Sequence, residues 1–282
     1  MNMRNVSYIK FKWLFIFTIF LFSVSFIGCS SANNNSKQKQ ISVSSNQVAE
    51  STVIIFPDKI LEKIIRAEIK KPTGNILKGD VDKITTLEAP VVLESPSLLQ
   101  ASLGKTVADL SGIENLTSLT KLSLPYSHIN NIEPLKELAN LTEIFLDHNQ
   151  INNIEPLKGL NKLTHLELDH NQISNIEPLK RLINLTKLTL SNNQINNIEP
   201  LRGLNNLNSL MLYNNKISNV ESLRGLTKLT ILSLRNNQII KIEPLKGLTK
   251  LTWLQLSYNQ IKDYTPVNSY YKNLTSRDFT LS

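Results

Sequence analysis

The four histidines of this 282-residue chain lie close together in the sequence and are accompanied by carboxylates. The pair Asp147-His148 recurs as Asp169-His170 after 22 residues, so a repeating fold would place the two pairs side by side on adjacent strands about 4.8 Å apart. Imidazole and carboxylate groups at this spacing are typical zinc ligands. The same polar composition also suits protein docking or a solvated surface, and all three interpretations stay open. The acidic group is defined as Glu143, Phe145, Asp147, His148, His165, Glu167, Asp169 and His170.

A second set of residues combines aromatic, aliphatic and arginine side chains. This composition is enriched where protein interfaces concentrate their binding energy. Isolated exposed apolar residues are normal, so the set predicts a binding surface only if its members are contiguous. The aromatic group is defined as Met211, Tyr213, Ile231, Arg235, Trp253 and Tyr258.

Motifs for catalysis and for cofactors are missing from the sequence. It contains no nucleophile elbow, phosphate-binding loop, HExxH or dinucleotide fingerprint, and no Ser/His/Asp set at a favourable spacing. We therefore expect neither an enzyme nor a bound cofactor. The net charge of +8 includes three basic residues among the first 28, and the remaining 28 basic and 23 acidic residues are spread along the chain. This distribution argues against nucleic acid as a partner.

The N-terminus carries an export pattern. Three basic residues precede the apolar run of residues 13–27, which ends at Gly28 and Cys29. This pattern predicts a signal peptide over residues 1–28. Phe26-Ile27-Gly28-Cys29 resembles the lipobox of bacterial lipoproteins, in which cleavage leaves a diacylated cysteine, although Phe26 stands where that family usually carries Leu. The resemblance implies lipidation of Cys29, and an uncleaved N-terminal anchor is the alternative.

Both alternatives place the remaining chain outside the cytoplasm, at the cell surface, the outer membrane or a periplasm-facing membrane. Cys29 is the only cysteine, so no internal disulfide can form and stability must come from packing. Residues 29–52 are polar and rich in Ser, Asn, Gln and Lys, which predicts a disordered tether.

A repeat dominates the sequence that follows. Residues 116–269 divide without insertion into seven units of 22 residues that follow the frame LxxLxxLxLxxNxIxxIxxL. Every position of its seven apolar columns is apolar. Because each unit can bury its apolar face only against its neighbours, this registry predicts a solenoid of stacked coils. The asparagines from Asn149 to Asn259 should satisfy backbone groups where each coil turns, while Ser127 marks the first unit as an edge repeat.

The segments on either side of the repeats predict caps. Residues 53–83 should form a helical N-terminal cap with a first helix starting at Pro57-Asp58 and a second within 78–83. Residues 84–115 are expected to form a degenerate first repeat with an insertion loop at 90–104, as the family resemblance given below implies. Residues 270–282 should form a capping strand, for which Asn273-Leu274 and residues 279–281 are the candidates.

Specific phrases of the chain resemble a known family. The repeats carry NLTxLxL and NIEPLKGL, and FPDKILEKIIR, KPTGNI and DLSGIENL precede them. Over residues 53 to 269 the chain resembles the bacterial internalins, a leucine-rich-repeat family. The resemblance implies an α/β fold: a right-handed leucine-rich-repeat solenoid with a parallel β-sheet on its concave face and a small helical N-terminal cap. It also implies a protein ligand, such as a host or cell-surface protein.

The repeat places both candidate groups on one face. In each LxL strand the leucines point inward, so the residues before, between and after them point outward along the concave face. We therefore predict an envelope-anchored, monomeric protein-binding module for adhesion or recognition. The alternative is a metal-binding envelope protein that uses His148, His170, Asp147 and Asp169. On the opposite edge, a column of Glu with Lys or Arg three residues later predicts structural ion pairs from Glu133-Lys136 to Glu243-Lys246.

Overall fold

The computed structural model describes residues 50–89 and 106–281, which lie in one compact unit, Val43–Ser282. The predicted signal peptide 1–28, the lipidation site Cys29, nearly all of the tether and the insertion loop at 90–104 therefore lie outside the described residues. Within the described ranges, no helix has both the length and the apolar character needed to cross a membrane.

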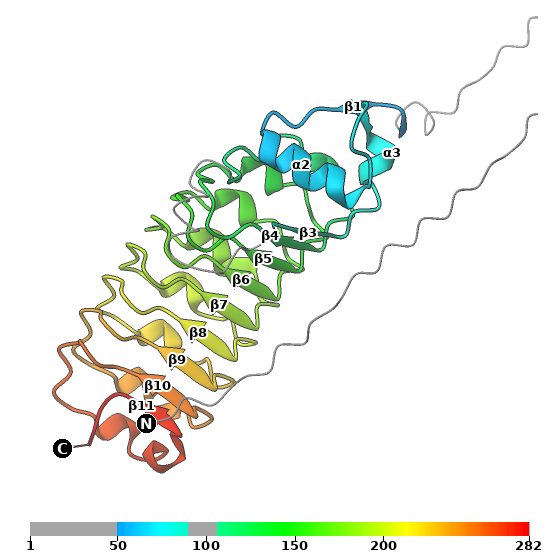
Figure 1. Ribbon diagram of the computed structural model, residues 1–282. Coiled ribbons are helices and arrows are strands. Elements are labelled where there is room, and N and C mark those ends of the chain that lie inside the picture. The colour runs from blue at the N-terminus through cyan, green and yellow to red at the C-terminus, as the bar shows by residue number, and fades with distance from the viewer. Residues whose placement is uncertain (1–49, 90–105, 282) are drawn as a thin grey trace, which may run out of the picture. The chain divides into compact units, whose positions relative to one another are not determined.

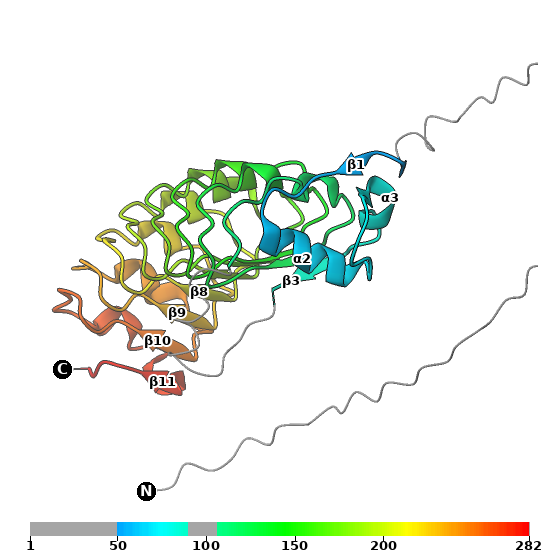
Figure 2. The ribbon, with the colours of Figure 1, turned by 45° about the horizontal axis from the view of Figure 1, so that its top comes forward.

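The described chain is a stack of coils in which strands line one side and short 3-10 helices line the other (Figures 1 and 2). The N-terminal cap contains β1 Val53–Ile54, α2 Lys59–Glu68, β2 Ile76–Leu77 and α3 Lys78–Val81. The strands of the stack are β3 Thr86–Glu88, β4 Lys121–Ser123, β5 Glu143–Phe145, β6 His165–Glu167, β7 Lys187–Thr189, β8 Ser209–Met211, β9 Ile231–Ser233, β10 Trp253–Gln255 and β11 Ser276–Arg277. The 3-10 helices are η1 Ile113–Asn115, η2 Glu133–Leu135, η3 Glu155–Leu157, η4 Glu177–Arg181, η5 Glu199–Leu201, η6 Glu221–Leu223, η7 Glu243–Gly247, η8 Thr265–Val267 and η9 Tyr271–Asn273.

The strands form one nine-stranded parallel sheet in the order β11-β10-β9-β8-β7-β6-β5-β4-β3. From β4 to β10 each residue pairs with the residue 22 positions further along, as Leu122 pairs with Ile144 and Ile144 with Leu166. The sheet thus has the repeat period built into its register, and the predicted leucine-rich-repeat solenoid is confirmed.

The core is a continuous apolar column through the stack. In each strand the two core residues of the LxL pattern are fully buried, as Leu188 and Leu190 show. Of the seven apolar columns, only Ile261 and Tyr264 in the last unit are partly exposed, because no further repeat covers them. Burial of this kind contributes about 25 cal/mol per Å² of apolar surface, which makes it the main favourable term in folding.

The repeated asparagine connects each coil with the coil before it. Asn193 Oδ1 accepts the backbone N–H of Ile173 at 2.9 Å, and its Nδ2 donates to Leu168 O at 3.0 Å and to Leu190 O at 3.1 Å. The same three bonds recur at each asparagine of the column from Asn149 to Asn259. The predicted role of this column is confirmed. Ser127 only donates within its own turn, at 3.4 Å to Pro125 O, as expected of an edge repeat.

One carboxylate joins the first helix of the N-terminal cap to the segment that leads into the repeats. Asp58 caps α2 by accepting from Ile60 N and Leu61 N through Oδ1, and it accepts from Ala108 N and Asp109 N through Oδ2. Burial acts to raise the pKa of Asp58, but these four donors outweigh it and hold the pKa below its ordinary value. Both predicted helices are present, and the antiparallel pair of β1 with β2 was not predicted from the sequence.

The C-terminal end carries the predicted capping strand, but at other residues than expected. The last strand is β11 at Ser276–Arg277, whereas Asn273 belongs to η9 and Phe279 stacks on Tyr264 with ring centroids 5.0 Å apart. The predicted strand positions were therefore wrong, because the segment uses aromatic packing to cover the last coil. Tyr270 is buried beneath this cover and donates its hydroxyl to Leu245 O at 2.8 Å.

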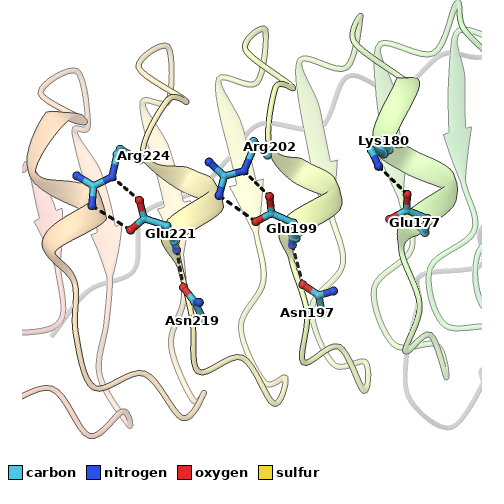
Figure 3. A network of polar contacts seen from close by, with 8 residues as sticks. All are labelled: Glu177, Lys180, Asn197, Glu199, Arg202, Asn219, Glu221 and Arg224. Carbon is cyan, nitrogen blue, oxygen red and sulfur yellow. Dashed lines mark hydrogen bonds and ion pairs between the residues drawn. The ribbon is translucent and has the colours of Figure 1, made fainter.

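The edge opposite the strands carries the predicted ion pairs (Figure 3). Each pair joins the first residue of a 3-10 helix to a base three positions later, as Glu177 with Lys180 and Glu199 with Arg202. Asn197 Oδ1 accepts the N–H of Glu199 and so holds the start of the turn. All of these groups are exposed, and an exposed ion pair contributes at most about 1 kcal/mol. Their regularity follows from the turn, and no binding role is needed to explain it.

We expect the Asn193→Ala variant to lose about 2–4 kcal/mol of unfolding free energy, because buried backbone groups in two neighbouring coils lose their partners. Urea denaturation followed by circular dichroism measures this loss. The matched control is Asn196→Ala, which removes an exposed amide of the same repeat and should change stability by less than about 0.5 kcal/mol. Equal losses in the two variants would contradict the bridging role.

Candidate binding site on the strand face

The outward side chains of β4 to β10 form two straight columns, which together we call the strand face. The first column pairs Lys121 with Glu143, Glu143 with His165 and so on to Trp253. The second column runs from Ser123 through Phe145 to Gln255. Because the register is one repeat per strand, residues of one column are direct neighbours.

Part of the acidic group is joined by contacts across the strands. Lys121 lies over the Phe145 ring at 5.4 Å, and Phe145 meets His165 edge to face with centroids 4.6 Å apart. His165 Nε2 is 2.9 Å from Glu167 Oε1, and Lys187 Nζ is 2.7 Å from the same oxygen. The sequence identified Phe145, His165 and Glu167 but overlooked the two lysines. Both lysines stand in the first outward column, one strand away from Phe145 or Glu167 in the second column, so diagonal pairing between neighbouring strands would have indicated them.

Two aspartates lie in the turns directly after β5 and β6. Burial raises the pKa of Asp169, and the negative charge of Glu167 acts in the same direction. Burial also raises the pKa of Asp147, again with contributions from Glu167 and Asp169. Asp169 Oδ1 accepts the backbone N–H of Ser191, so this carboxylate is used to join neighbouring coils. Glu143 lies in the same face between Lys121 and His165.

The column beside these aspartates has a backbone conformation that the sequence did not predict. Its residues all have positive φ, between 52° and 57°, where most residue types are strained. Asparagine tolerates this region best and histidine tolerates it moderately, whereas tyrosine does not favour it. The turn therefore explains the asparagines, and the outlying tyrosines are better explained by the contacts of their rings. The column consists of Tyr126, His148, His170, Asn192, Asn214, Asn236 and Tyr258.

Side chains of this column stack from one coil to the next. The His148 ring lies parallel to the rings of Tyr126 and His170, with centroids 4.2 Å and 3.9 Å away. His170 Nε2 is 2.9 Å from Asn192 Nδ2. Parallel rings direct their nitrogens side by side rather than toward one point, so this arrangement does not converge on an ion. Among the described residues, no group of three or more His, Cys, Asp or Glu side chains could hold a metal ion.

Two members of the aromatic group, Tyr213 and Arg235, line a hollow of about 350 Å³. Ile231 and Trp253 are paired neighbours of the first column. The guanidinium of Arg235 lies 4.8 Å from the centre of the Tyr258 ring, which is a cation–π contact. Met211 stands in the second column beside Ser233. The residues lining the hollow are Asn192, Tyr213, Asn214, Arg235, Asn236 and Gln255.

Four residues of that lining were not among the predicted site residues. The three asparagines belong to the positive-φ column, and Gln255 ends the second outward column. The recurrence of Asn at one position is typical of a turn, and it gives no indication that the same side chains line a hollow. The sequence-predicted Tyr213 and Arg235 do line it.

Comparison with known proteins identifies the same repeat fold. The model of the family "Leucine Rich repeats (2 copies)" matches residues 139–181, 183–225, 205–247 and 227–269. The chain belongs to the leucine-rich-repeat proteins, a class that generally binds other proteins through this scaffold. Among solved structures it is similar to an internalin C2 from Listeria monocytogenes, at 34% identity and a TM-score of 0.73 over 82% of this chain and 98% of that one.

Two further Listeria monocytogenes structures match less closely. An internalin F is 26% identical with a TM-score of 0.39 over 81% of this chain and 97% of that one. The functional domain of internalin J, which includes a cysteine ladder, is 22% identical with a TM-score of 0.47 over 79% of this chain and 54% of that one. No curated protein sequence matches the chain.

The stacked histidines should make stability depend on pH. Burial, and then the charge of His170, lowers the pKa of His148 from its ordinary 6.5. The unfolded chain therefore takes up this proton first as the pH falls. The stability that neutral His148 contributes is complete above pH 6.5 and is lost as the pH falls through the lower folded-state pKa.

We expect the melting temperature to fall less between about pH 7.5 and about pH 5 in His148→Asn than in the unchanged protein. Asparagine suits the positive-φ backbone at this position, so the substitution removes the titrating ring without adding strain. Differential scanning calorimetry measures both profiles. Asn214→His, at an equivalent position without a histidine neighbour, serves as a comparison. Identical pH profiles for His148→Asn and the unchanged protein would contradict the proposed effect of the stacked pair.

Proposed function

We propose that this protein recognises a protein partner through its strand face, as an adhesion or recognition module of the cell envelope. The observation that carries the proposal is the contrast between two sets of columns. The inward columns are uniform and buried, whereas the outward columns change residue type at every strand and gather aromatic and charged side chains. A packing requirement explains the inward uniformity and leaves the outward variation to be explained by a partner.

The proposal extends the general property of leucine-rich-repeat proteins to this particular face. Exposed Tyr258 and the half-buried Tyr213 and Trp253 provide aromatic area of the kind that anchors interfaces. Phe145 provides a second anchor nearer the N-terminal end. Phe145 and Trp253 lie on short strands of one sheet, and the two tyrosines lie in the turns that follow β8 and β10, so little conformational entropy is lost when a partner binds.

The binding surface can be located by photo-crosslinking in the protein's own cells. We expect a photoreactive phenylalanine analogue at Phe145, Tyr213 or Trp253 to give one common crosslinked protein. The same analogue at Lys158 or Lys180, on the opposite edge, should not give this adduct. The triple variant Phe145→Ala, Tyr213→Ala, Trp253→Ala should reduce affinity for that protein by at least about tenfold. Crosslinks confined to the opposite edge would refute the assignment.

Envelope anchoring through Cys29 is a separate part of the proposal. It is supported by the basic residues, the apolar run and the Gly28-Cys29 junction at the N-terminus. A dual or triple acyl attachment would hold the solenoid at a membrane surface, where a single chain binds only reversibly.

We expect cells fed an alkyne-tagged fatty acid to label the unchanged protein and not Cys29→Ser. The Cys29→Ser variant should move from the membrane fraction to the soluble fraction or remain as uncleaved precursor. Mass spectrometry of the N-terminal peptide distinguishes a cleaved, acylated cysteine from an uncleaved anchor. Unchanged labelling in Cys29→Ser would contradict lipidation at this residue.

A further inference from the structure

The hollow on the strand face is rich in unused hydrogen-bond donors. The guanidinium of Arg235 contacts the Tyr258 ring face and has no ion-pair or hydrogen-bond partner among the described residues. A ring beneath the plane of a guanidinium leaves the N–H edges available. Arg235 is exposed, so these edges are accessible from solvent.

The amides that line the hollow add further donors. Asn214 Nδ2 donates one hydrogen to Asn192 Oδ1 at 2.6 Å, and Asn236 Nδ2 donates one to Asn214 Oδ1 at 2.7 Å. Each amide nitrogen carries two hydrogens, so one remains on each of these two residues. Gln255 Oε1 accepts from Ser233 Oγ at 3.1 Å, which leaves both hydrogens of its Nε2. The ladder thus uses Asn192 Oδ1 and Asn214 Oδ1 as acceptors and leaves more donor hydrogens than acceptors, since among the described residues only Asn236 Oδ1 of the three amide oxygens receives no hydrogen bond.

The charge of the lining residues favours an anionic ligand. None of its lining residues is acidic. Asp278, at the C-terminal end of the sheet, already accepts from Leu256 N, Ser257 N and Ser257 Oγ. A planar, doubly accepting anion matches one guanidinium edge and neighbouring amide donors, and a carboxylate has this geometry.

Apolar side chains in the outward columns of the same strands indicate what kind of molecule carries that carboxylate. Ile231 and Trp253 are adjacent in the first column, and Met211 lies in the second column. We propose that the hollow binds the carboxylate of an aspartate or glutamate side chain of the protein partner. An apolar residue of the partner next to it then contacts Met211, Ile231 and Trp253, which we call the apolar shoulder. This inference rests on the proposed function and specifies the partner's chemistry.

The test uses the full chain, purified in detergent, and two capped pentapeptides. One peptide places a glutamate between leucine and phenylalanine, and its twin carries glutamine instead. Side-chain amide signals of Asn214, Asn236 and Gln255 are followed by NMR during titration. We expect the glutamate peptide to shift these signals and to bind at least about tenfold more tightly than its twin. Arg235→Gln should abolish the preference, whereas Arg224→Gln, on the opposite edge, should retain it.

Each alternative outcome overturns the inference. Equal affinity for the two peptides, or no shift of these amides at millimolar peptide, excludes a carboxylate site. If acetate alone competes as well as the glutamate peptide, the hollow is a general anion site and the apolar shoulder contributes nothing. A carboxylate preference that survives Arg235→Gln in a folded variant removes Arg235 from the site. The crosslinks at Phe145 and Trp253 are independent of these results, so the proposed function can stand when this inference fails.

Discussion

The buried asparagine amide is the interaction on which the rest of this molecule depends. A coil of 22 residues leaves backbone groups unpaired wherever it turns out of its strand. Apolar packing alone would leave these groups buried without partners, at a cost comparable to a lost hydrogen bond for each. One amide satisfies groups in its own coil and in the coil before it, as Asn193 does for Leu190 O and Ile173 N. The register of the sheet therefore follows from satisfying polar groups as well as from burying leucines.

This constraint also determines what the strand face can present. The residue just before each buried asparagine must adopt positive φ, which places its side chain beside the outward columns at a fixed spacing. Asparagine fills this place in three consecutive units and forms a hydrogen-bonded ladder. Tyr126, His148 and His170 fill it in the first units and stack, whereas Tyr258 in the last unit contacts Arg235. The same residues thus allow the backbone to turn and supply side chains to the strand face. The polar hollow lies where the ladder of asparagines meets Arg235.

The sequence predicts the fold so fully because its periodicity encodes contacts between neighbours. The apolar columns, the asparagine column and the cap at Asp58 all follow from local rules that can be read without coordinates. The candidate site is predicted less fully. Alternation along each strand identifies which side chains point outward, but positive φ at His148 or Asn214 and the side-chain contacts of Lys187 depend on rotamers and on neighbouring coils. A capping strand within residues 270–282 was predicted, but its exact position was missed, because packing of Phe279 on Tyr264 joins segments outside the repeat pattern.

The two groups on the strand face differ in what a partner could gain from them. In the acidic group, Glu167 is already paired with Lys187 and His165, and Asp169 accepts a backbone N–H. A partner that binds there must replace bonds that exist, so the net gain is small. Around the hollow the donors of Arg235, Asn236 and Gln255 are unused, and desolvating them against acceptors creates bonds that the free protein lacks. Binding energy should therefore be concentrated toward the C-terminal repeats, with the acidic group contributing more to the orientation of the partner than to its affinity.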